Sequence, residues 1–270
     1  MKLSNIFTKK NRVLLAELVR TEFKLRYQDS ALGFLWSLLK PLLMFAILYF
    51  VFGKLLRIGS NIEHYAVYLL LGIVLWNFFV EATSQGLSAI VARGDLIRKI
   101  NFPKYIIVIS GTISALINLG INMVVIGVFM AINGVQLLAT APLVLLPIIV
   151  LYILSLAIAF FLAAANVKYR DVGHIWDIVI QAAFYATPIL YPISMVLAIN
   201  HTIGSLLMLN PVAQAIQDAR YYLITPQTTT TSQVFSEWYI VAIPYVVTVI
   251  IIVLATLYFR KSSKYFAENV

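Results

Sequence analysis

Few side chains in this sequence are of the types that carry covalent or metal chemistry. There is no cysteine, and the three histidines, His64, His174 and His201, are far apart. Disulfides, thiolate ligands and cysteine nucleophiles are therefore excluded, and a histidine metal cluster is not indicated. Catalysis by paired carboxylates needs two acids on one water-accessible face, and the sequence shows no such pair. We therefore expect neither catalytic residues nor a metal site nor a cofactor bound by this chain.

The composition of the chain is that of a membrane protein. Of 270 residues, 61% are hydrophobic and 11% are charged, against about 25% charged in soluble domains. The mean hydropathy is +0.92. This composition predicts a single all-α membrane domain and excludes most soluble enzymes and nucleic-acid binders.

Six apolar runs approach the roughly 20 residues that a membrane-crossing helix needs. They are residues 34–56, 65–87, 105–132, 141–165, a fifth run that begins near 175, and 238–259. The fifth run meets Pro188 and Pro192, so we expect that span to be short or broken. The predicted domain therefore consists of an N-terminal region (1–33), a six-span bundle (34–259) and a tail (260–270).

The distribution of basic residues sets the orientation. With six spans, 16 of the 20 lysines and arginines fall on one side of the membrane. Lys54, Arg57 and Arg220 fall on the other side, and Lys40 lies within the first span. Cytoplasmic loops carry the basic excess, so this face and both termini are predicted to be cytoplasmic. The formal net charge of +9 is then explained by topology, and no nucleic-acid partner is needed. No cleavable signal peptide is evident, and the first span is the expected insertion signal.

Two cytoplasmic segments have the pattern of contact elements. Residues 11–29 predict an amphipathic helix at the membrane interface, with apolar Leu15, Val19 and Phe23 four residues apart and basic Arg20 and Lys24 elsewhere. This helix either orients the first span as a basic anchor or transmits force.

The loop 92–103 predicts a short basic helix that Asp95 caps and Pro103 ends. It would either dock in the groove of a cytoplasmic partner or face the lipid. The residues that would make the docking contact are Asp95, Ile97, Arg98, Ile100 and Phe102.

The outer segment between the last two spans contains apolar runs that are too short to cross. Residues 199–209 and 212–224 suit re-entrant or interfacial helices. The threonine run Thr228–Thr231 is expected to form an exposed loop tip.

Ionisable residues inside spans cost about 2.5–3.5 kcal/mol each on insertion scales, so each needs a reason. Lys40 either snorkels to the cytoplasmic headgroups or contacts an anionic substrate. Glu81 is either a structural hydrogen-bonding partner or a pathway residue. Asp177 lies at the mouth of a span, where we expect a helix-end role.

Aromatic residues make up 13% of the chain, and many lie at span ends, as expected of an interfacial belt. Some lie beside small or polar neighbours and would be able to stack on sugar faces in a channel. The candidate rings are Trp36, Tyr49, Trp76, Phe184, Tyr185 and Tyr191.

Three stretches resemble the polysaccharide-exporting permeases of the ABC-2 type, which move O-antigen, capsular polysaccharide or teichoic acid. They are RYQDSALGFLWSLLKPL (26–42), LIRKINFP (96–103) and NVKYRDVGH (166–174), the last followed by PILYP (188–192) and LNP (209–211). Their order and spacing agree with that family across nearly the whole chain. Lys40 stands where related chains often have an uncharged polar residue.

The resemblance implies a bacterial inner-membrane permease that pairs with a second copy of itself and with two copies of a separate ATPase. ATP and Mg²⁺ would be used by that partner, because this chain has no GxxxxGK[ST] loop. The N-terminal helix, the 95–103 segment and Arg170 and Asp171 in the next loop would contact the ATPase. A lipid-linked polysaccharide would pass between the two copies, and short helices after Pro192 would close the exit.

Two alternatives remain open at this stage. An ABC-2 permease for a drug or small lipid would share the fold. A membrane-embedded glycosyltransferase would turn over its substrate without any ATPase.

Overall fold

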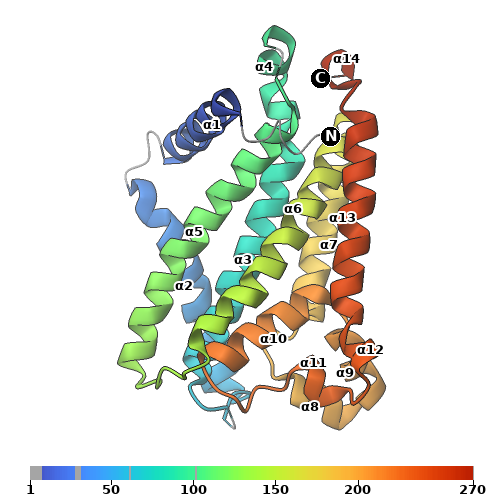
Figure 1. Ribbon diagram of the computed structural model, residues 1–270. Coiled ribbons are helices and arrows are strands. Elements are labelled where there is room, and N and C mark those ends of the chain that lie inside the picture. The colour runs from blue at the N-terminus through green and yellow to red at the C-terminus, as the bar shows by residue number, and fades with distance from the viewer. Residues whose placement is uncertain (1–7, 28–31, 61, 101, 270) are drawn as a thin grey trace.

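The computed structural model describes residues 8–27, 32–60, 62–100 and 102–269, and every regular element among them is helical (Figure 1). The first half contains α1 (Lys9–Tyr27), η2 (Gly33–Leu35), α2 (Trp36–Leu48), η3 (Tyr49–Leu55), α3 (Tyr65–Ala89), η4 (Val91–Arg93), α4 (Gly94–Lys99) and α5 (Tyr105–Ile132). The second half contains η5 (Ala141–Val144), α6 (Leu145–Lys168), α7 (Val172–Ala186), α8 (Ile193–Ile199), α9 (His201–Met208), α10 (Pro211–Leu223), α11 (Thr231–Val234), α12 (Trp238–Val241), α13 (Ile243–Ser262) and α14 (Phe266–Asn269).

Five helical stretches in the described residues are long and apolar enough to cross a membrane. They are Trp36–Leu55, Tyr65–Ala89, Tyr105–Ile132, Ala141–Lys168 and Trp238–Ser262. Each corresponds to a predicted span, and α5 has the predicted bounds. The predicted fifth span forms α7, which has 15 residues and ends before Pro188. At 1.5 Å per residue it is about 22 Å long, and it is not one of these five.

Helix α3 forms the centre of the bundle. From Tyr65 to Trp76 its sequence is apolar on every side, as expected of a helix that is surrounded by protein. Within its most apolar stretch 78% of the residues are buried, against 11% for Trp36–Leu55. It packs against α5 and α6, and α13 packs on α6. At Gly86 a Cβ atom would overlap the Cβ of Ala159, so the glycine allows α3 and α6 to approach closely.

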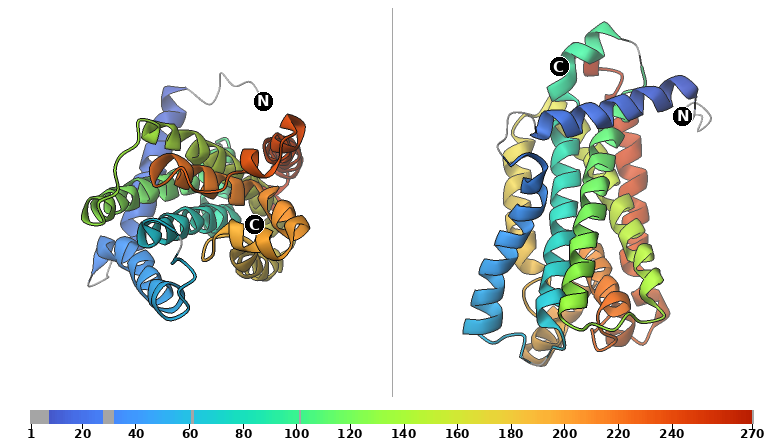
Figure 2. Two further views of the ribbon diagram at one scale, coloured as in Figure 1. Left: turned by 90° about the horizontal axis from the view of Figure 1, so that it is seen from below. Right: turned by 90° about the vertical axis from the view of Figure 1, so that its left-hand side faces the viewer.

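The helices that do not run along the bundle lie at its two ends (Figure 1). Helices α1, α4 and α14 lie at one end, and α8 to α12 lie at the other. Helices α2 and α7 both lie on the same side of the bundle, with α3 between them, while α5, α6 and α13 form the opposite side (Figure 2). A second protein surface placed against α2 and α7 would therefore enclose the exposed face of these two helices.

The outer segment differs from the sequence prediction at the threonine run. Thr228, Thr230 and Thr231 are buried, so the prediction of an exposed loop tip is wrong. Thr230 and Gln233 form a reciprocal capping box at α11. Thr231 donates to the carbonyl of Met208 (3.4 Å), which ties the run to α9.

Candidate functional site

Helix α7 carries an exposed polar stripe. His174, Asp177, Gln181 and Tyr185 are spaced by three or four residues and therefore lie on one face, and all four are exposed. No residue of α7 is buried. The carboxylate of Asp177 forms no hydrogen bond or ion pair with another residue in the described ranges. Because a carboxylate facing hydrocarbon is costly, this stripe is suited to water or to another protein surface.

Four of the six candidate rings come together at the α8 end of α7. Trp76 of α3 lies 5.9 Å from Phe184, and Phe184 lies 5.4 Å from Tyr185 (centroid distances). The hydroxyl of Tyr191 donates to the carbonyl of Tyr185 (2.9 Å). Trp76 is 4% exposed and Tyr185 is 69% exposed. The buried Trp76 and the half-buried Phe184 and Tyr191 thus lie beside one aromatic side chain, Tyr185, that projects from the bundle.

The other channel candidates on α2 lie apart from this cluster. Trp36 and Lys40 are both exposed near the start of α2. Tyr49 begins the π-helical turn η3, is half-buried and stacks on Phe45 at 5.6 Å. Trp36 and Lys40 are thus open to a partner or to lipid, whereas Tyr49 packs mainly against its own bundle.

Glu81 is held between two helices. Its carboxylate accepts hydrogen bonds from Gln85 of α3 (2.9 Å) and from Asn118 of α5 (3.0 and 3.2 Å). An interhelical contact of this kind satisfies polar groups that would otherwise be buried unpaired. The geometry in the single chain is that of the structural partner, one of the two roles that the sequence left open.

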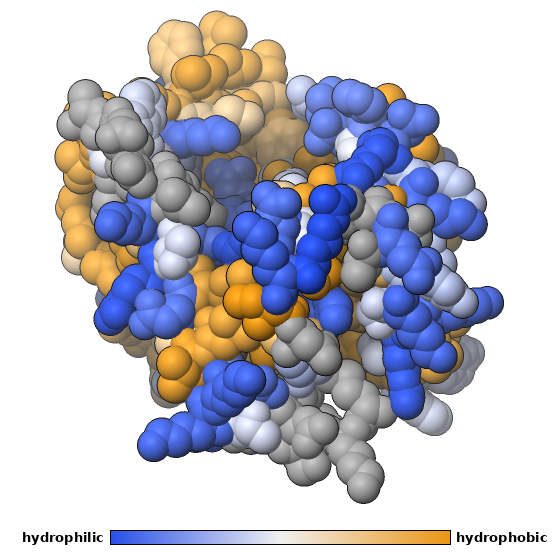
Figure 3. Space-filling model, turned by 90° about the horizontal axis from the view of Figure 1, so that it is seen from above, coloured by the Kyte–Doolittle hydropathy of each residue, from blue (hydrophilic) through white to orange (hydrophobic). Residues whose placement is uncertain are grey.

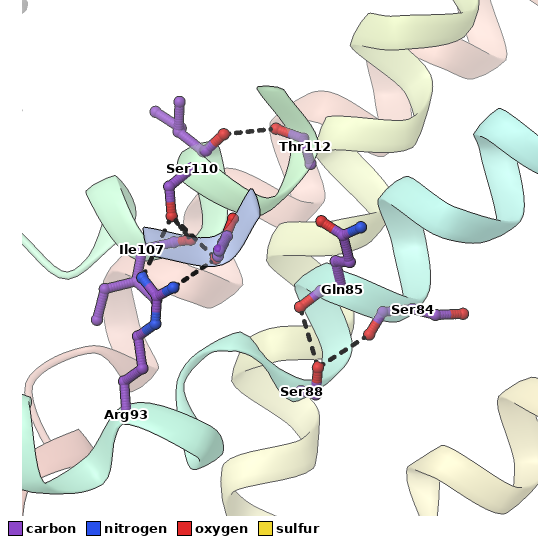
Figure 4. A network of polar contacts seen from close by, with 9 residues as sticks. Ser84, Gln85, Ser88, Arg93, Ile107, Ser110 and Thr112 are labelled. Carbon is purple, nitrogen blue, oxygen red and sulfur yellow. Dashed lines mark hydrogen bonds and ion pairs between the residues drawn. The ribbon is translucent and has the colours of Figure 1, made fainter. Parts of the chain in front are cut away.

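An ion pair and an apolar face hold helix α1 against the bundle. Glu22 Oε1 lies 2.7 Å from Arg93 Nη2, and both side chains are mostly buried. Arg93 also points toward Ser110 of α5 (Figure 4). Leu15, Val19 and Phe23 line a groove with α5 side chains, as the predicted amphipathic pattern requires.

The two basic candidates on α1 lie beside this apolar face, and Arg20 also lines the groove. Arg20 and Lys24 are exposed, and Arg20 pairs only loosely, at 3.5 Å, with Glu17 of the same helix. The end of the bundle that carries α1, α4 and α14 is rich in hydrophilic side chains, with apolar ones between them (Figure 3). Arg170 and Asp171, which precede α7, are also exposed.

The loop 92–103 forms the short helix α4, but two details of its prediction are wrong. Arg93 is the N-cap residue, and Asp95 lies in the first turn. Ile97 and Phe102 are 4% and 6% exposed, because they pack into an apolar cluster with Phe259 and Phe266. They anchor the loop to its own bundle. Asp95, Arg98 and Ile100 remain exposed, and Ile100, at 49%, is the apolar side chain that is open to a partner.

Sequence reasoning missed Arg220, which it treated only as a basic residue of the outer face. Arg220 is fully buried in α10. It donates hydrogen bonds to the carbonyls of Tyr68 (3.0 Å), Pro188 (2.7 Å) and Ile189 (2.8 Å). The available signal was its setting, because small and apolar residues occupy most positions around it in α10. No group of three or more His, Asp or Glu residues in the described part of the chain is placed to hold a metal ion.

These features are those of a multi-pass helical membrane protein with exposed polar side chains on α7 and at the end that carries α1, α4 and α14. Residues 13–224 match the ABC-2 type transporter family. The O-antigen export system permease protein RfbA of Myxococcus xanthus is 35% identical over 187 residues, which cover 68% of this chain and 70% of that protein. A protein of the same name from Klebsiella pneumoniae is 28% identical over 207 residues, covering 75% and 77%. The chain therefore belongs to the ABC-2 type transporter family and is a transport permease rather than an enzyme.

Proposed function

We propose that this chain is the membrane subunit of an ATP-driven exporter that moves a lipid-linked polysaccharide, of the O-antigen, capsule or teichoic acid type, across a bacterial inner membrane. The observation that carries the proposal is the exposed polar stripe of α7, which ends in Tyr185. A sugar chain presents hydroxyls and flat apolar faces, which polar side chains and an exposed ring match. The relatives named as O-antigen export permeases support the same cargo class.

In this proposal two copies of the chain face each other across their α2 and α7 helices. The pairing would place the α7 stripes and the exposed Trp36 and Lys40 along a shared aqueous path. It would also remove Asp177 from contact with lipid, where a charge is costly. Two copies of a separate ATPase would bind the end that carries α1, α4 and α14. Asp95, Arg98 and Ile100, together with Arg20, Lys24, Arg170 and Asp171, are the proposed contact residues.

We further propose six crossings, with α7 as the short one. The chain passes from the α4 end to the α8 end of the bundle along α7 (Figure 1). A helix of about 22 Å is shorter than a hydrocarbon core of about 30 Å. The buried residues that follow α7, from Thr187 to Leu190, would span the remaining distance. Helices α8 to α10 would then lie at the outer interface as re-entrant or interfacial elements, and both termini would be cytoplasmic.

The absence of cysteine allows a direct test of this topology. Asp171→Cys and Ser194→Cys place single thiols at exposed positions on either side of α7. In intact cells, a membrane-impermeant maleimide should label the Cys at 194, whereas the Cys at 171 should react only after the cells are made permeable. Equal labelling of both positions in intact cells would contradict a crossing by α7.

Transport is tested with the chain and its partner ATPase in proteoliposomes that contain a lipid-linked glycan. Tyr185→Ala should slow glycan export by about two- to tenfold, the range expected for one aromatic contact, and Asp177→Asn and Gln181→Leu should also slow it. Tyr239→Ala on α12 is the matched control, because it removes an exposed tyrosine away from the stripe. Export at the normal rate in all three stripe variants would contradict the pathway. ATPase stimulation by a drug or a short lipid, without any by glycan, would contradict the cargo.

A further inference from the structure

A cavity of about 700 Å³ lies at the end of the bundle that carries α4 and α14. Its walls come from the residues that link α4 to α5, from the first turns of α5, from α6, and from the last turns of α13 with the two residues that follow. The floor is apolar and partly aromatic, and Phe160 and Phe259 meet edge to face at 4.9 Å within it. Cavities of 300–1,000 Å³ are the usual size of sites for small molecules.

The rim of this cavity is basic. Lys104, Arg260 and Lys264 line it, and no acid does. These three cations form no ion pair within the described part of the chain. The nearest acid in the sequence is Glu268, on α14, which does not line the cavity. The summed charge at the rim therefore favours an anion.

The two parts of the cavity together identify the class of occupant. A soluble anion would use the cationic rim but would gain nothing from the apolar floor, and a neutral acyl chain would not use the cations. Helix α13 exposes apolar side chains, including Val253 and Leu257, next to Thr256, which lines the cavity. Basic pockets between membrane helices on the cytoplasmic side are suited to anionic lipid headgroups.

We propose that this cavity binds one anionic phospholipid of the cytoplasmic leaflet. The phosphate lies at the rim formed by Lys104, Arg260 and Lys264, and an acyl chain lies on the floor against Ile109, Phe160 and Thr256. Phe102, which anchors the α4 loop, is part of the same wall. The bound lipid therefore braces the junction between the α4 loop and α13. This site does not depend on the identity of the transported cargo.

The test uses the full chain in nanodiscs that contain photoreactive phosphatidylglycerol or photoreactive phosphatidylcholine as the probe. Phosphatidylglycerol should crosslink to residues 102–109 and 256–264 in preference to phosphatidylcholine. The variant Lys104→Gln/Arg260→Gln/Lys264→Gln should lose this preference, by about fivefold for each cation removed. The matched control, Lys9→Gln/Lys10→Gln/Lys99→Gln, removes the same charge from exposed positions at the same end and should keep it.

A second pair of variants tests the cavity itself. Thr256→Trp should fill the floor and reduce crosslinking of both lipids at these segments, whereas Val253→Trp, one turn earlier on the exposed face of α13, should not. Equal crosslinking of the two lipids would overturn the proposal, as would an unchanged preference in the triple glutamine variant or unchanged crosslinking in Thr256→Trp. Displacement of the probe by a polyisoprenyl diphosphate, but not by excess unlabelled phosphatidylglycerol, would overturn it in favour of a substrate-lipid site.

Discussion

The guanidinium carbon of Arg220 lies 3.6 Å from the centre of the Tyr68 ring. The same side chain donates four hydrogen bonds, three to main-chain carbonyls and one to Gln217 Oε1 (2.8 Å). No carboxylate in the described part of the chain forms an ion pair with it. One buried cation thus joins α10, α3 and the segment that follows α7, at the end of the bundle opposite α4. Opening of an exit at this end would have to keep or replace these bonds.

Arg220→Met should therefore be strongly destabilising. The substitution leaves the carbonyls of Pro188 and Ile189, which lie outside any helix, without a donor. Each orphaned buried group costs about 1–3 kcal/mol, so we expect a loss of at least about 2 kcal/mol. Arg220→Lys should recover only part of it, because an ammonium lacks the planar fork. Thermal unfolding in detergent, followed by fluorescence-detected size exclusion, measures the loss. Arg170→Met, at an exposed position, should change the melting temperature little; equal melting of the two methionine variants would contradict the assignment.

The Glu22–Arg93 pair should control the docking of α1. Glu22→Gln weakens a 2.7 Å ion pair whose two side chains are each less than 20% exposed, so amide hydrogens of residues 9–27 should exchange faster while those of α3 do not. Removing one charge of a mostly buried pair leaves the other without compensation, so it costs more than breaking a surface pair, for which about 0–1 kcal/mol is typical. Glu17→Gln, which breaks only the exposed pair with Arg20, is the matched control.

The reversed pair Glu22→Arg/Arg93→Glu distinguishes a specific ion pair from a general effect of charge. It should protect the α1 amides better than either single reversal, because each single change places like charges together. If the double reversal protects no better than the single ones, the docking of α1 does not depend on this pair.

Ile100 and Ile97 should behave differently when each is replaced by aspartate. Ile100 is half exposed, so Ile100→Asp should leave the melting temperature near that of the wild type while it reduces co-purification of the partner ATPase. Ile97 is 4% exposed, so Ile97→Asp buries a charge and should lower stability by several kcal/mol. Tagged pull-down and thermal unfolding of the same preparations separate the two effects. Normal recovery of the ATPase with Ile100→Asp would contradict the proposed contact.

The sequence was sufficient to predict elements whose signals are local. Helix α5 has the predicted bounds because an uncharged, mostly apolar run is flanked by Pro103 and by Asn133 and Gly134. Helix α7 ends where Thr187 and Pro188 follow it, since proline cannot continue a helix. The apolar face of α1 was predicted correctly because Leu15, Val19 and Phe23 recur with the helical period.

The features that the sequence did not reveal depend on contacts between distant segments. Ile97 and Phe102 look like free apolar anchors in their own loop, but Phe259 and Phe266, more than 150 residues later, cover them. Arg220 looks like an exposed outer cation because its acceptors lie on α3 and after α7. The spacing of Asp177, Gln181 and Tyr185 places them on one face of α7. The sequence does not show that this face is exposed, because exposure depends on how few helices pack against α7.

Asp218 gives the structure a predictable pH dependence. It lies on α10, outside the five long apolar helices, and lines a cavity of about 270 Å³ that also includes Gln214, Tyr222 and Tyr245. Burial removes water from the carboxylate and raises the pKa of Asp218 from 3.8 to about 7. The folded chain therefore holds a proton that the unfolded chain releases at lower pH.

As the pH rises from about 4 to about 7, the unfolded state binds fewer protons than the folded state, so Asp218 should lower the stability of the fold across this window and leave it constant above it. The full penalty is at most about 4 kcal/mol. Asp218→Asn cannot ionise, and its melting temperature should exceed that of the wild type at pH 8 and converge with it near pH 4. Asp171→Asn, at an exposed acid, should show no such pH-dependent gain. If the melting temperatures of Asp218→Asn and of the wild type differ by the same amount from pH 4 to pH 8, the buried carboxyl is not the source of the effect.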